Sequence, residues 1–134
     1  MREPNIDIRS SDPVYYNHLK DWFTVLFQKV KPHMYHNGGN VIMVQVENEY
    51  GSYYRCDHEY LAKICDLTEE LLGKETVLFT TDGPNDNMLK CGSIAERAYA
   101  TVDFGTYDNI QSCFNIERKY NNGKGPYVNS EREA

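Results

Sequence analysis

The stretch VIMVQVENEYGSY, residues 41–53, decides the fold of this chain. It begins as a short, mostly β-branched strand, continues through Asn48 and Glu49, and leads directly into a loop with a glycine and tyrosines. In parallel α/β enzymes, a strand whose C-terminal end carries acidic and amide side chains presents them to a substrate. A second stretch of this kind, PYVNSE, lies at residues 126–131 and ends in Glu131.

Two glutamates at the ends of two separate strands are what glycoside hydrolysis requires. One carboxyl group donates a proton to the leaving oxygen, and the other acts as nucleophile or base on the opposite side of the scissile bond. From the spacing alone, Glu49 and Glu131 form a candidate catalytic pair. Solvated loop acids with no catalytic role are the alternative, because exposed carboxylates are common.

Apolar periodicity and turn residues predict alternating helices and strands along the chain. The predicted helices cover residues 11–31, 57–72 and 109–119, with shorter helical segments near 87–89 and 94–97, and the predicted strands cover 41–49, 76–80, 100–104 and 127–130. Such alternation indicates parallel strands joined by right-handed crossovers. Residues 1–10 are polar and are expected to be irregular.

An open doubly wound sheet and part of a (β/α)8 TIM barrel both fit this α/β order. No glycine-rich phosphate loop follows a strand, which argues against a nucleotide-binding sheet. Polar residues at the predicted strand ends, among them Thr81, Asp82 and Asp103, favour a barrel mouth. Because a whole barrel needs about 250 residues, we expect a partial barrel with about four parallel strands.

Composition excludes several function classes. The 134 residues carry a net charge of −6, so nucleic acid is not an expected partner. No apolar stretch approaches the roughly 20 residues of a membrane span. The first five residues contain no apolar segment, and we therefore expect no signal peptide in this chain.

The cysteines and histidines give no metal motif. Cysteines at positions 56, 65, 91 and 113 lack the CxxC spacing of zinc sites, which leaves disulfides or buried thiols open. His33 and His36 lie three residues apart but have no further ligand type nearby, so no metal site is predicted.

The positions of the aromatic residues suggest packing or substrate-binding roles. Trp22 lies on a predicted amphipathic helix and is expected in the core. Tyr50, Tyr53 and Tyr54 follow Glu49, where they would either stack on a sugar ring or pack the loop.

Five ordered motifs resemble glycoside hydrolase family 35, and in particular the lysosomal acid beta-galactosidases of animals. The motifs are QVENEYGSY (45–53), LFTTDG (78–83), LKCG (89–92), TVDFG (101–105) and NSE (129–131). The resemblance runs from about residue 9 to residue 131. It implies a (β/α)8 barrel that hydrolyses terminal β-galactosides with retention of configuration, acting on β-galactoside glycans or glycolipids without a cofactor.

The resemblance also implies roles for individual residues. Glu49 would be the acid/base at the end of barrel strand four, and Glu131 the nucleophile at the end of strand seven. Asn48 would bind the sugar 2-hydroxyl. Cys56 and Cys91 match positions that form a disulfide, which would leave the other two cysteines as free thiols.

The sequence departs from the family pattern after Glu131, where Arg132, Glu133 and Ala134 replace an aromatic stretch. Residues 1–134 would then be a fragment of the catalytic barrel, equivalent to strands four to seven. We expect the isolated chain to be inactive. A catalytically silent carbohydrate-binding or interaction module is the alternative. The resemblance implies a lysosomal or extracellular location, and the sequence predicts no oligomeric state.

Overall fold

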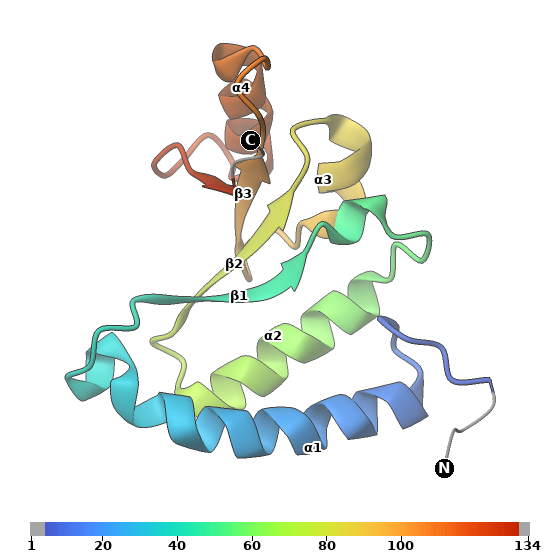
Figure 1. Ribbon diagram of the computed structural model, residues 1–134, viewed down its shortest axis with the longest axis vertical. Coiled ribbons are helices and arrows are strands. Elements are labelled where there is room, and N and C mark those ends of the chain that lie inside the picture. Colours follow the sequence, from blue (N-terminus) through green and yellow to red (C-terminus); the bar gives the residue numbers. More distant parts are fainter. Residues whose placement is uncertain (1–4, 132–134) are drawn as a thin grey trace.

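The structure of the protein is a computed structural model that describes residues 5–131 (Figure 1). Four strands alternate with helices along the chain, as the sequence predicts. The helices are α1 (Pro13–Val30), α2 (His58–Leu72), α3 (Asp86–Gly92) and α4 (Ile110–Tyr120), the strands are β1 (Met43–Asn48), β2 (Val77–Asp82), β3 (Tyr99–Asp103) and β4 (Asn129–Glu131), and the short 3-10 turns are η1 (Lys31–His33), η2 (Tyr35–Asn37) and η3 (Tyr50–Ser52).

Polar side chains cap the first turns of three of the helices. The carboxylate of Asp12 accepts hydrogen bonds from the Val14 and Tyr15 amides at 2.8 and 3.0 Å. Asp57 caps α2 through the Tyr60 amide, and Asn109 caps α4 through the amide of Ser112. These bonds satisfy amide groups that have no partner within the helix, and they fix the first turn.

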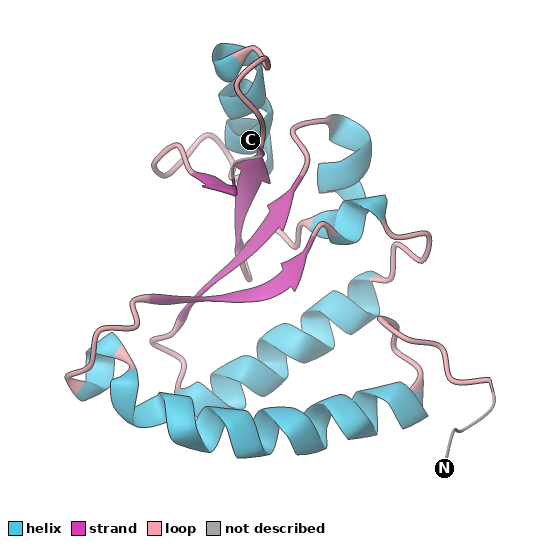
Figure 2. Ribbon diagram, in the orientation of Figure 1, coloured by secondary structure: helices cyan, strands magenta, loops and turns pink. Residues whose placement is uncertain are grey.

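The strands form one parallel sheet in the order β1-β2-β3-β4, which confirms the predicted partial α/β barrel (Figure 2). One side of the sheet packs on the helices. Val46, Leu78, Leu61 and Ile64 belong to a core cluster between β1, β2 and α2. A second cluster joins β3 to α3 and α4. Burial of these apolar faces holds the half-barrel together.

The register shifts at two places in the sheet. Gln45 pairs with Phe79, but the next pair is Glu47 with Thr80, so Val46 is an extra residue in β1. Val102 pairs with Asn129, and Asp103 pairs with Glu131, so Ser130 is an extra residue in β4. An extra residue reverses the strict alternation of side chains after it. The first extra residue lies two positions before Asn48, and the second lies directly before Glu131.

Some expectations differ from the structure. Residues 94–97 form a turn, not a helix, with the Arg97 and Ala98 amides bonded to the Ile94 carbonyl. Trp22 is 60% exposed, so its predicted core position is wrong. It lies at the margin of the stripe through which α1 packs, whereas Phe27 is buried.

The segment from residue 5 to residue 10 contains neither helix nor strand, as expected, and residues 1–4 lie outside the described part of the chain. Between residues 5 and 131, no helix combines the length and the apolar character needed to cross a membrane.

Candidate active site

The candidate residues gather at the C-terminal ends of the parallel strands. Asn48 ends β1, Asp103 ends β3 and Glu131 ends β4, while Glu49 directly follows β1. Because the strands are parallel and adjacent, all four residues lie at the same end of the sheet, where the C-termini of the strands meet. The side chains of Asn48, Glu49 and Glu131 are exposed there.

The backbone of Glu49 is held in an unusual conformation. Its φ is +49°, a left-handed value that costs energy for a residue with a side chain. Its amide donates to the carbonyl oxygen of Thr81 at 2.7 Å, and its own carbonyl accepts from the Ser52 amide and hydroxyl. The strand therefore ends at Asn48, and the position of Glu49 is set by its bond to β2.

Asn48 is exposed at the C-terminal end of β1. The shift at Val46 pairs it with Thr81, and its side-chain oxygen accepts a bond from the Gln45 amide group at 2.7 Å. Arg9 donates to the Asn48 carbonyl at 2.7 Å. The exposed amide of Asn48 therefore adjoins Glu49 at the open edge of the sheet.

Asp103 connects the two predicted carboxyl groups, and its place between them was not predicted. It pairs with Glu131 across β3 and β4, and it lies near enough to Glu49 for the charge of Glu49 to act on its carboxyl group. It is only 8% exposed. Burial first, then the interaction with Glu49 and the negative charges of Glu49 and Glu131, raise the pKa of Asp103 to about 6. Glu49 and Glu131 are thus brought to a common neighbour.

A cluster of hydroxyl groups lies beside these carboxyls. The Thr81 hydroxyl is 3.2 Å from the Thr101 hydroxyl and 2.9 Å from that of Ser130, and the latter two are 2.6 Å apart. Each group comes from a different strand. The shift at Ser130 turns its hydroxyl toward the other two. Sequence reasoning missed this cluster, although small hydroxyl residues recur at the three strand ends.

Glu47, in contrast, has a structural role. Its carboxylate accepts from Arg9 at 3.0 and 2.6 Å and from the Tyr60 hydroxyl at 2.9 Å. Alternation would place Glu47 and Glu49 on the same side if the strand continued. Since it ends at Asn48, Glu47 is directed toward α2 and Glu49 toward Asp103.

The tyrosines after Glu49 differ in exposure. Tyr50 is fully buried, and its hydroxyl donates to the Arg9 carbonyl, so it is unable to stack on a sugar. Tyr53 is half-buried beneath the Arg9 guanidinium, 4.8 Å from its ring centre. Tyr54 is 73% exposed. Loop packing is therefore the role of Tyr50.

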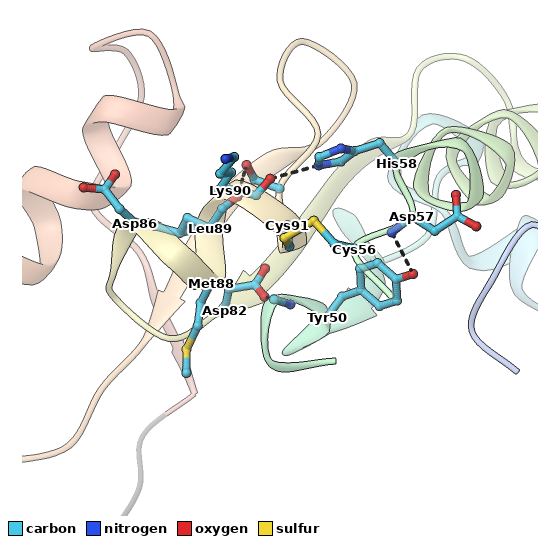
Figure 3. The surroundings of a disulfide bond; sticks show 12 residues. Tyr50, Cys56, Asp57, His58, Asp82, Asp86, Met88, Leu89, Lys90 and Cys91 are labelled. Carbon is cyan, nitrogen blue, oxygen red and sulfur yellow. Dashed lines mark hydrogen bonds between the residues drawn. A yellow bond between two sulfur atoms is a disulfide. The ribbon is translucent and has the colours of Figure 1, made fainter. Parts of the chain in front are cut away.

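A disulfide joins Cys56 to Cys91, as the resemblance implies, with 4.7 Å between the two Cα atoms (Figure 3). It connects the loop after η3 to α3. Cys65 and Cys113 are buried free thiols. His36 hydrogen-bonds the Leu72 carbonyl at 3.0 Å. Within residues 5–131, no group of three or more histidine, cysteine or acidic side chains is arranged to hold a metal ion.

A cavity of about 780 Å³ opens at the other end of the sheet. Residues Lys74, Val77, Tyr99 and Tyr120 contribute to its lining, and none of the candidate residues does. Active sites of barrels lie at the C-terminal ends of the strands, so this cavity does not relocate the candidate site.

Comparisons with known proteins agree with the motifs. The sequence profile described as Glycosyl hydrolases family 35 matches residues 1–134. The chain is 49% identical over 131 residues to "Beta-galactosidase-1-like protein" of Mus musculus, covering 98% of this chain and 20% of the relative. It is 49% identical to "Beta-galactosidase" of Homo sapiens and 50% identical to that of Canis lupus familiaris, with 98% of this chain and 19% of each relative covered.

The chain therefore spans about a fifth of the length of the curated relatives it matches. A profile match over all 134 residues nevertheless settles its membership: the chain belongs to glycosyl hydrolases family 35.

Proposed function

We propose that this chain supplies the two catalytic carboxyl groups of a retaining beta-galactosidase. The observation that carries the proposal is the arrangement at the C-terminal ends of the strands, where Asp103 pairs with Glu131 across β3 and β4 and feels the charge of Glu49, which directly follows β1. Membership of the family, and relatives named beta-galactosidase, support the reaction class.

The proposed mechanism uses each residue in one role. Glu131 attacks the anomeric carbon while Glu49 protonates the departing glycosidic oxygen, and a covalent galactosyl-enzyme forms. Glu49 then removes a proton from water, which releases galactose with its original configuration. Asn48 would bind the 2-hydroxyl, a contact that strengthens as the transition state develops. This two-carboxyl chemistry requires no metal or organic cofactor.

The active unit is proposed to be a longer barrel in which these strands are numbers four to seven. β1 and β4 are the outer strands of the sheet, and a closed barrel would pair both outer edges. For the 134-residue chain alone we expect no measurable hydrolysis. The proposed substrates are glycans or glycolipids with a terminal β-galactose, in a lysosomal or extracellular location.

A chimera tests the catalytic roles. This chain would replace the matched segment of the Homo sapiens beta-galactosidase, and hydrolysis of a chromogenic β-galactoside would be measured at pH 4–5. Glu49→Gln and Glu131→Gln should each lower kcat by at least about 10²-fold, the scale of a lost acid or base. Glu70→Gln, at an exposed position on α2, is the matched control.

Two outcomes would contradict the proposal. A Glu131→Gln chimera as active as Glu70→Gln would remove the nucleophile assignment. A first-formed product of α configuration, seen by proton NMR, would show inversion. If the chain is a silent binding module, galactose should raise its melting temperature, but a galactose-derived covalent inhibitor should not label Glu131.

A further inference from the structure

Asp82 is a buried acid with an incomplete set of hydrogen bonds. It ends β2, and its side chain is fully buried. One carboxyl oxygen, Oδ1, accepts from the Gly51 amide at 2.7 Å. The other, Oδ2, has no hydrogen-bond partner among the described residues. Figure 3 shows the carboxyl group between the turn at Tyr50 and α3.

The packing around this carboxyl group leaves no spare volume. A Cβ atom on Gly92 would overlap the carboxyl of Asp82. A Cβ atom on Gly51 would overlap the Met88 carbonyl. Both positions therefore require glycine because η3, β2 and α3 approach one another so closely.

Two bonds from adjacent β2 residues hold the segment that contains Glu49. The Thr81 carbonyl accepts from the Glu49 amide at 2.7 Å, and the Asp82 carboxyl accepts from the Gly51 amide, also at 2.7 Å. Glu49 is the first of these two attachment points, and its backbone has a strained left-handed conformation. Such a conformation persists only when the surroundings impose it.

We propose that Asp82 is a positioning residue for Glu49, because it holds the η3 turn that follows Glu49 against the tip of β2. The catalytic part of this statement rests on the proposed function. The structural part does not: Asp82 sets the closure of the turn whether or not Glu49 is catalytic.

The groups that face Asp82 make this closure sensitive to pH. Burial raises the pKa of Asp82 to about 7, the bond from Gly51 opposes the rise, and the charges of Asp103, Glu47 and Glu49 add to it. All three charged neighbours are acids. Other ionisable groups nearby point elsewhere.

The remaining ionisable side chains of η3 and α3 are directed away from this carboxyl. The Tyr50 hydroxyl turns toward the Asp57 amide, and Lys90 and Asp86 point outward in Figure 3. Asp86 pairs with Lys119 of α4 at 2.5 Å. No cation on these elements therefore offsets the ionisation of Asp82.

The sign of the effect follows from linkage. With the turn closed, the pKa of Asp82 is about 7, and with the turn open and the carboxyl in water it returns to its ordinary value near 4. The equilibrium constant for closing the turn is therefore largest below about pH 4. It falls by up to about tenfold per pH unit as the pH rises toward 7, and it is constant above pH 7.

Amide hydrogen exchange on the 134-residue chain tests the proposal. After correction for intrinsic exchange, the protection of the Gly51 and Glu49 amides should fall by about tenfold or more between pH 5 and pH 7, and then level off. Asp82→Asn keeps an acceptor for Gly51 but has no charge, so its protection should vary with pH much less than that of the unsubstituted chain. Asp86→Asn, on α3 with an exposed carboxyl, should behave as the unsubstituted chain does.

Every other result overturns the proposal. Protection that is independent of pH in the unsubstituted chain, or a Gly51 amide unprotected at pH 5, would show that Asp82 does not control the turn. So would Asp82→Asn matching Asp86→Asn. If Asp82→Asn does not fold, the unsubstituted chain still tests the proposal by NMR. The chemical shift of the Gly51 amide must then change with pH at the same midpoint as the chemical shift of the Asp82 carboxyl carbon.

The same substitutions in the chimera with the Homo sapiens beta-galactosidase measure the consequence for Glu49. Asp82→Asn should flatten the fall in kcat between pH 5 and pH 7 with little change in KM. If exchange responds as expected but Glu49→Gln leaves activity intact, the proposed function fails while the role of Asp82 in the turn stands.

Discussion

Asp103 stands directly opposite Glu131 in the pairing of β3 with β4, and its carboxyl group also lies within range of the charge of Glu49. Three acids from three chain segments therefore meet at one strand edge. Because Asp103 is nearly buried, its negative charge is poorly solvated there. The arrangement stores an unfavourable interaction at neutral pH that protonation relieves.

Replacing Asp103 with asparagine should therefore stabilise the chain at neutral pH. Its pKa in the folded chain, about 6, is above the ordinary value, so its favourable contribution is complete below about pH 4 and lost as pH rises through 6. At pH 7.5, Asp103→Asn should raise the melting temperature by a few degrees, which corresponds to about 1 kcal/mol. The gain should vanish or reverse at pH 4.

Thermal melting at the two pH values measures this difference. Asp21→Asn is the control, because Asp21 is exposed on α1 and its substitution should give the same small change at both pH values. A melting temperature that falls equally at pH 4 and pH 7.5 in Asp103→Asn would contradict the expectation.

Glu117 should stabilise the segment that leads into β4. It is fully buried on α4, and its carboxyl oxygens accept from the Val128 amide at 2.9 and 3.2 Å. Glu117→Ala would leave that amide without a partner beside a cavity, at a cost of about 2–4 kcal/mol. Glu117→Gln keeps an oxygen acceptor and should cost less.

Urea unfolding at pH 5 measures both variants, with Gln111→Ala at an exposed position of α4 as the control. Burial raises the pKa of Glu117 to about 7, so the contribution of its protonated form weakens as pH rises toward 7. The free energy of unfolding of Glu117→Gln should therefore rise relative to that of the unsubstituted chain between pH 5 and pH 7.5. Equal effects of Ala and Gln would show that the Val128 bond is unimportant.

Local signals in the sequence were sufficient to predict the order of the elements. Asp12, Asp57 and Asn109 each precede an apolar stripe with helical spacing, and each is a helix cap in the structure. Caps and periodicity act over a few residues, so a single sequence contains them. The parallel half-barrel follows because alternating helices and strands leave few other connections.

The details of the site depended on contacts distant in sequence. The shifts at Val46 and Ser130 decide which side chains face the open side, and neither residue type signals an irregular strand. Trp22 was wrongly predicted to be buried, because helical spacing does not show which side of the apolar face of α1 is covered by another element. Asp103 was recognised only as a polar strand end, since its electrostatic interaction with Glu49 spans more than fifty residues.

The ion pair of Arg9 and Glu47 should contribute more to stability than a surface pair. The Glu47 side chain is only 10% exposed, and Arg9 binds it through two nitrogens at 3.0 and 2.6 Å. Arg9→Ala would leave a nearly buried carboxylate without its cation, which should cost about 2–3 kcal/mol. Urea unfolding at pH 7 measures the loss.

Lys63→Ala provides the comparison, because Lys63 pairs with the exposed Glu59 one turn away on α2. Surface pairs of this kind contribute little, so this variant should unfold close to the unsubstituted chain. If the two variants lose equal stability, the partial burial of Glu47 has no energetic consequence.

Reduction of the Cys56–Cys91 disulfide should lower stability substantially. The bond closes a segment with a sequence separation of 35, and it ties the loop after η3 to α3. In the chain-entropy description, losing a cross-link over such a segment costs roughly 4 kcal/mol. Urea unfolding with and without a phosphine reductant should therefore show a clear shift of the midpoint. The Cys56→Ser/Cys91→Ser double variant should unfold near the reduced midpoint under both conditions, because Cys65 and Cys113 are free thiols. A double variant that still responds to the reductant would place the effect elsewhere.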